Sequence, residues 1–208
     1  MIHRVWLEIH KFIVTHLLLF IFITVLFSIS VLFGAIVVQA LENSQKTELY
    51  LYFNSFLSYI GQLELSDNTI MVEALGRNLK HLGILWILGL SVIGLPVIIA
   101  MVFIKGFSIG FTVAFLIEQY SIKGLQLAIA TILPQNLIIV PVTIFVGVAG
   151  IVFSIQLIQN RIINEGKSLF ARFIQYGIII AISILLIVLA SCYEAYVAPN
   201  FFRFIEII

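Results

Sequence analysis

Residues 124–160 read GLQLAIATILPQNLIIVPVTIFVGVAGIVFSIQLIQN, an almost uninterrupted apolar run. A straight helix needs about 20 residues to cross a bilayer, so this run is too long for a single crossing. Pro134 and Pro141 lack backbone N–H donors and disfavour helical geometry in the residue before each. We therefore predict a membrane helix that is broken at Pro134. Other helices must pack around the break, because lipid cannot satisfy free backbone groups.

The composition predicts an all-α, polytopic membrane helix bundle that forms one integral membrane domain over residues 1–208. The chain is 62% hydrophobic and only 10% charged, whereas a soluble domain has about 25% charged residues. The chain is therefore expected to lie in the lipid bilayer. The formal net charge is +1, and no dense group of Lys and Arg is present to favour nucleic acid or anionic lipid as a main partner. The single cysteine, Cys192, has no second cysteine with which to pair.

Hydropathy predicts about five spans. The clearest is 17–40, which has no charged residue and is expected to be retained as a first helix rather than cleaved as a signal peptide. Further spans are expected at 82–104, in the second part of 124–160 and at 173–191. The apolar run 106–117 is short, so it is either a third span completed by tilted flanks or one arm of a re-entrant hairpin.

Residues 41–80 are predicted to form an external loop that contains an amphipathic helix. Leu49, Phe53, Phe56 and Ile60 recur at helical spacing, which suits a helix that lies on the membrane, against a partner or on the protein's own helices. Residues 1–16 and the tail from Pro199 onward are expected at the membrane surface.

We expect the N-terminus inside and the C-terminus outside. This arrangement places six of the 11 Lys and Arg residues inside and five outside, a weak bias by the positive-inside rule. If residues 106–133 turned back to their starting side, the bias would reverse.

No motif typical of an enzyme is present in the sequence. We searched for paired histidines with a glutamate between them, Gly-x-Ser-x-Gly, a phosphate-binding glycine loop and an aspartate dyad. His3, His10 and His16 are not spaced to converge on one helical face. The sequence therefore predicts no catalytic residues, no cofactor and no metal site.

The candidate functional positions are residues for packing or partner binding. Lys105, Glu118 and Glu194 lie at the ends of apolar runs, where reaching to the interface explains a charge. Gln135 and Asn136 either replace backbone hydrogen bonds lost at Pro134 or line a transport site. Glycines at GxxxG spacing allow helices to approach closely. The candidates are Phe53, Phe56, Gly106, Gly110, Pro134, Gln135 and Asn136.

Short motifs in one order along the chain carry a family resemblance. They are Phe33-Gly34-Ala35, Gly94-Leu95-Pro96, Lys105-Gly106-Phe107 with Gly110-Phe111-Thr112, Leu133-Pro134-Gln135-Asn136 followed by Pro141, and Glu194-Ala195-Tyr196-Val197 followed by Pro199. Together they resemble the stage II sporulation protein M family. The resemblance implies a multi-pass protein of the mother-cell septal or engulfing membrane, needed for engulfment of the forespore.

Two functions remain open. The resemblance implies a membrane scaffold that recruits and holds two peptidoglycan-degrading partners, the stage II sporulation proteins D and P. The alternative is a small transporter or permease-like subunit with a polar site near Pro134. A homo-oligomer is compatible with either function.

Overall fold

The computed structural model describes residues 2–62, 67–163 and 169–197, and every regular element within these ranges is helical. The predicted all-α membrane helix bundle is thus confirmed. In chain order the helices are α1 (Ile2–Thr15), α2 (Leu17–Ala40), α3 (Asn43–Gln62), α4 (Asp67–Gly89), α5 (Gly94–Leu127), the π-helix η1 (Ala128–Ile132), α6 (Leu133–Ile163) and α7 (Leu169–Tyr196). The expected surface tail from Pro199 onward lies outside the described residues.

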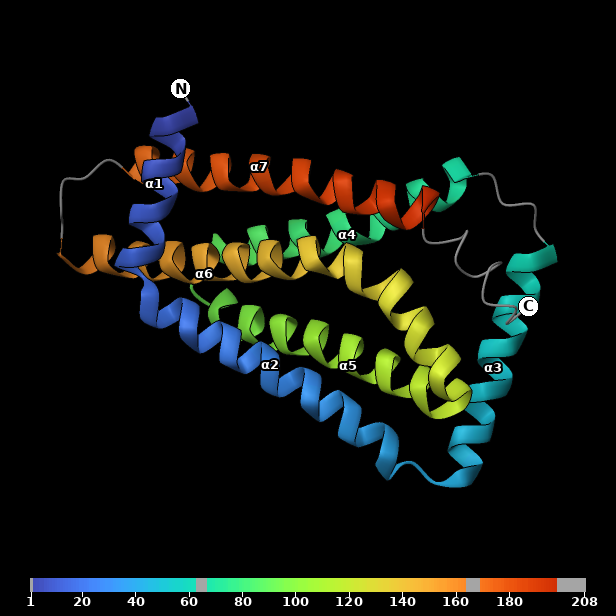
Figure 1. Ribbon diagram of the computed structural model, residues 1–208. Coiled ribbons are helices and arrows are strands. Elements are labelled where there is room, and N and C mark those ends of the chain that lie inside the picture. The colour runs from blue at the N-terminus through green and yellow to red at the C-terminus, as the bar shows by residue number, and fades with distance from the viewer. Residues whose placement is uncertain (1, 63–66, 164–168, 198–208) are drawn as a thin grey trace.

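The helices α2, α4, α5, α6 and α7 lie side by side along one axis (Figure 1). Helix α1 lies across one end of this bundle and α3 across the other (Figure 1). We call these the α1 end and the α3 end. Each long helix supplies apolar side chains to one core, among them Ile23, Leu85, Ile98, Val146 and Ile187.

Within the described residues, three helical stretches are long and apolar enough to cross a bilayer: Leu17–Ala40, Gly94–Gln159 and Phe173–Tyr196. The first has the predicted bounds. The second contains 66 residues and folds back on itself at Ser121, whose φ of 51° and ψ of −123° interrupt the helix. Helices α5 and α6 are therefore antiparallel (Figure 1), and residues 106–117 belong to a full-length helix rather than a re-entrant arm.

The predicted span 82–104 is wrong, because the chain reverses direction between Gly89 and Gly94. A Cβ at Gly94 would lie 1.9 Å from the carbonyl oxygen of Leu88, so the turn requires glycine there. The hydroxyl of buried Ser154 on α6 donates to the carbonyl of Gly89 at 2.8 Å and lies 3.1 Å from that of Ser91. The Ser154 hydroxyl thereby ties the end of α4 to α6, while Ser91, Val92 and Ile93 of the turn itself are exposed. As a result, residues 67–80, predicted within the external loop, form the first part of α4.

The break expected at Pro134 lies just before it. Residues Ala128–Ile132 form a π-helical turn, and α6 then runs without interruption from Leu133, with Pro134 as its second residue. A π-helical turn is a common way to accommodate a local defect in a helix. Helix α6 also bends in its first half (Figure 1), the part of the helix that contains Pro141, and proline is a usual cause of such a bend.

Glycines bring α2 and α5 into backbone contact. A Cβ at Gly34 would lie 2.3 Å from the carbonyl oxygen of Phe107, and one at Gly110 would lie 1.9 Å from that of Val31. At Gly106 the nearest atom would be the Ser30 hydroxyl oxygen, at 2.0 Å. The GxxxG surface of α5 is therefore occupied by the protein's own α2.

Replacing Gly110 with alanine should destabilise the folded protein. The added Cβ meets backbone atoms that cannot move aside, so we expect a loss of about 1–3 kcal/mol or more. Thermal unfolding of the purified protein in detergent measures this. Gly177→Ala is the matched control, because nothing lies within 4 Å of a Cβ there. An equal loss in both variants would contradict the close α2–α5 contact.

Candidate functional site

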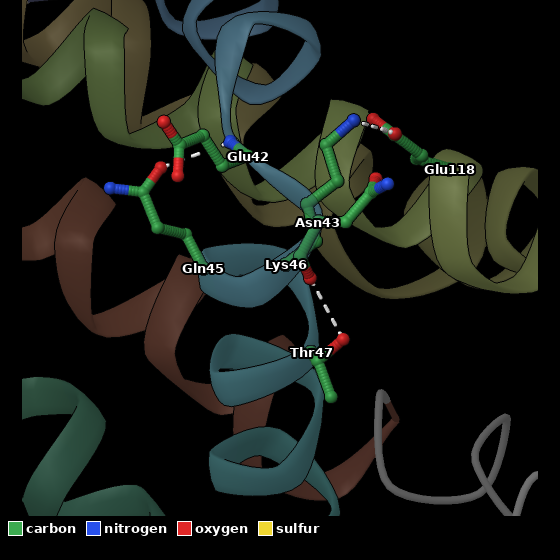
Figure 2. A network of polar contacts seen from close by, with 6 residues as sticks. All are labelled: Glu42, Asn43, Gln45, Lys46, Thr47 and Glu118. Carbon is green, nitrogen blue, oxygen red and sulfur yellow. Dashed lines mark hydrogen bonds and ion pairs between the residues drawn. The ribbon is translucent and has the colours of Figure 1, made fainter.

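The start of α3 is tied to the end of α5 by a small polar network (Figure 2). The backbone N–H of Glu42 donates to Oε1 of Gln45 at 3.0 Å, an arrangement that satisfies a free donor at a helix start. One turn further, Nζ of Lys46 contacts Oε1 of Glu118 on α5 at 2.5 Å. Glu118, expected to reach into the interface alone, is thus paired.

The middle of α3 packs on the same part of α5. The Phe53 ring meets Phe115 edge-on with 6.0 Å between ring centroids, and Phe53 also packs on the buried cluster of Leu116, Leu127 and Ala128. The Tyr120 hydroxyl donates to Oδ1 of Asn54 at 3.0 Å. Helix α3 is therefore docked on the bundle by an ion pair at its start and aromatic contacts two turns later.

The opposite face of α3 is open. Leu51 and Tyr52 are 59% and 77% exposed, and Glu48 and Ser55 are exposed beside them. We call these four residues the α3 outer face. Of the two phenylalanines singled out in the sequence, Phe53 is on the docked side, and the side chain of Phe56 lies outside what the structure describes.

Most of the polar side chains near Pro134 donate hydrogen bonds to backbone carbonyls. In a regular helix the N–H of residue 134 would donate to the carbonyl of Ala130, and proline has none. The Tyr193 hydroxyl from α7 donates to that carbonyl at 2.9 Å. Nδ2 of Asn136 donates to the carbonyl of Ile132 at 2.8 Å. Oε1 of Gln135 is buried and has no hydrogen-bond partner among the described residues.

A group of charged and polar side chains lies where α4 meets α5 and α7, and sequence reasoning missed it. Arg77 on α4 forms an ion pair with Glu194 on α7, and Nδ2 of Asn78 lies 3.4 Å from the hydroxyl oxygen of Ser191. Lys105 on α5 is within electrostatic range of both Arg77 and Glu194. Since Lys105 follows Gly94 by eleven residues, it lies about 16 Å into its helix rather than at a span end.

In the described part of the chain, no three His, Cys, Asp or Glu residues are placed to hold a metal ion. The ring of His16, at the junction of α1 and α2, packs at a tilt against Phe12 with 4.9 Å between ring centroids. Partial burial lowers the pKa of His16, which favours its neutral form at neutral pH.

The stage II sporulation protein M model matches residues 23–199, most of the chain and all the long helices. The chain belongs to this family. It is therefore a sporulation-related membrane protein. No curated protein and no solved structure matches it. In this member of the stage II sporulation protein M family, the α3 outer face is exposed, and Arg77, Lys105 and Glu194 form a charged group where α4 meets α5 and α7.

Reversing the charge of Lys46 should loosen α3. In Lys46→Glu two carboxylates face each other, so backbone amides of α3 should exchange hydrogen faster, with a cost of about 1 kcal/mol or less for this partly exposed pair. Hydrogen exchange followed by mass spectrometry measures this. The double variant Lys46→Glu with Glu118→Lys restores opposite charges and should restore protection. Equal exchange in all three proteins would show that the ion pair does not hold α3.

Proposed function

We propose that this chain is a membrane scaffold that recruits and holds the stage II sporulation proteins D and P at the septal membrane during forespore engulfment. The observation that carries the proposal is the α3 outer face. It exposes Leu51 and Tyr52 on a helix whose Lys46 and Asn54 contact Glu118 and Tyr120 of α5. Exposed apolar and aromatic side chains at the end of a membrane bundle favour a protein partner. The family is not a known enzyme family.

The proposed orientation places the α1 end inside the cell and α3 outside, where peptidoglycan lies. Among the described helices, the α1 end carries Arg4, Lys11, Arg161 and Arg172, whereas the α3 end carries Lys46 and Lys123. This is a clearer positive-inside bias than the one counted on the sequence. Arg77, Lys80 and Lys105 are left out of the new count, because they lie along helices of the bundle rather than at either end.

A transporter remains the second candidate, on the strength of the buried amide oxygen of Gln135. Two other groups on which that function would depend are already engaged, since Asn136 donates to the Ile132 carbonyl and Glu118 pairs with Lys46. The scaffold therefore has the stronger support.

An accessible cysteine tests the orientation. Ser44 is exposed at the start of α3, so Ser44→Cys in a Cys192→Ala background should react with an impermeant thiol reagent on intact cells. The Cys192→Ala protein alone is the control. Labelling that requires permeabilised cells would place α3 inside and overturn the proposed orientation.

The scaffold function predicts that Leu51→Asp reduces co-purification of both hydrolases and blocks engulfment, because a charge then replaces an exposed apolar contact. Ile122→Asp is the matched control, since Ile122 is also exposed, at 73%, in the turn between α5 segments rather than on α3. Normal co-purification in Leu51→Asp would exclude the α3 outer face. Loss of engulfment in Gln135→Ala with both partners retained would favour the transporter.

A further inference from the structure

One face of α4 carries charges that nothing in the described chain fully balances. Glu73, Arg77 and Lys80 recur at offsets of four and three residues, so they share one side of the helix, and all three are exposed. Gly76 and Gly83 lie on the same side, and nothing is within 4 Å of a Cβ built on either. We call these five residues the α4 outer face.

This face belongs to a helix that packs beside candidate membrane spans, although α4 itself is not one of the three stretches that are long and apolar enough to cross. Lys80 is thirteen residues after Asp67 and nine before Gly89, so it is about 20 Å and 14 Å from the two helix ends. Helix α4 lies beside α5, α6 and α7. Its Arg77 pairs with Glu194, which lies two residues before the end of the apolar stretch Phe173–Tyr196. A charge that faces lipid beside such helices is expensive and typically marks a functional surface.

The charge balance of this region lacks a carboxylate. Three cations, Arg77, Lys80 and Lys105, lie in this part of α4 and α5, and Glu194 is engaged by Arg77 and lies within electrostatic range of Lys105. Lys80 forms no ion pair with any described residue. Glu73 lies seven residues from Lys80, about 10 Å nearer the α3 end.

We propose that the α4 outer face binds a transmembrane helix of a partner, and that an acidic side chain on this helix pairs with Lys80 and Arg77. The inference rests on the proposed scaffold function and names the surface that would hold a partner's membrane anchor. Gly76 and Gly83 flank Lys80 and remove side-chain bulk, which allows the close backbone approach typical of membrane helix pairs.

A partner helix fits this face better than a second copy of the chain does. Two copies related by an axis along the membrane normal have parallel α4 helices, so equal residues meet at equal depth. Lys80 would then face Lys80, and Arg77 would face Arg77. A carboxylate on a different helix instead neutralises the excess charge.

A synthetic helix tests the chemistry directly. The probe is a fluorescent leucine-rich transmembrane peptide with one glutamate at its centre, and its twin has glutamine there. With the full-length protein in phosphatidylcholine vesicles, energy transfer should show the glutamate peptide binding about tenfold more tightly or better, as expected for a charge-assisted hydrogen bond. Lys80→Gln should abolish this preference, and Gly83→Leu should weaken binding of both peptides.

Two matched controls accompany these variants. Lys123→Gln removes an exposed lysine outside the α4 outer face, and Gly177→Leu enlarges a glycine that is equally open. Neither should alter peptide binding. Equal binding of the two peptides to the wild type would overturn the proposal and indicate that Lys80 is neutralised by lipid phosphate. Efficient disulfide-linked dimers of Gly83→Cys in the Cys192→Ala background would overturn it in favour of a second copy.

Co-purification from cells distinguishes a failure of this inference from a failure of the proposed function. Lys80→Gln and Gly83→Leu should each reduce co-purification of the stage II sporulation proteins D and P, while both controls retain them. If the two variants retain both hydrolases and Leu51→Asp loses them, the scaffold stands and the α4 proposal fails. If neither hydrolase co-purifies with the wild type but the glutamate peptide still binds, the α4 outer face stands and the proposed function fails.

Discussion

Every backbone polar group in an apolar environment needs a partner, and the arrangement of this bundle depends on how two defects meet that requirement. At the α4–α5 turn, the hydroxyl of Ser154 from α6 donates to the carbonyl of Gly89. Before Pro134, the hydroxyl of Tyr193 from α7 donates to the carbonyl of Ala130. Both donors come from helices more than sixty residues away in the chain. The places where the helical hydrogen bonds fail are thus the places where α6 and α7 are fixed to their neighbours.

The same requirement explains what the sequence could and could not predict. Helix α2 was predicted with its observed bounds, because an uncharged apolar run lies between His16 and Glu42. The α4–α5 turn was missed, because Leu90, Val92 and Ile93 make it as apolar as the helices that it joins. Hydropathy reports the environment of a residue and not the direction of the chain. Gly89, Gly94 and Pro96 are local signals of a turn, but hydropathy alone does not distinguish them from small residues inside one long span.

Because the turn was missed, three charged residues were also assigned to the wrong places. With a span ending at residue 104, Lys105 lay at a membrane surface, and Arg77 and Lys80 lay in an external loop. The structure places all three on helices of the bundle. The ion pair of Arg77 with Glu194 joins residues 117 positions apart, and no local pattern predicts such a pair. Sequence reasoning could therefore recognise the family and the fold class, whereas the charged group on α4, α5 and α7 could be found only once the helices were placed.

The glycines show why spacing alone does not identify a binding surface. Gly106 and Gly110 have GxxxG spacing, and the backbone of α2 fills that surface. Gly76 and Gly83 have no such spacing, and the space beside them is open. Packing glycines make α2 and α5 a rigid unit, and Lys46 and Tyr120 hold α3 on its end. Since Leu51 and Tyr52 are presented on a formed helix, a partner binding there loses less conformational freedom than one that must order a loop.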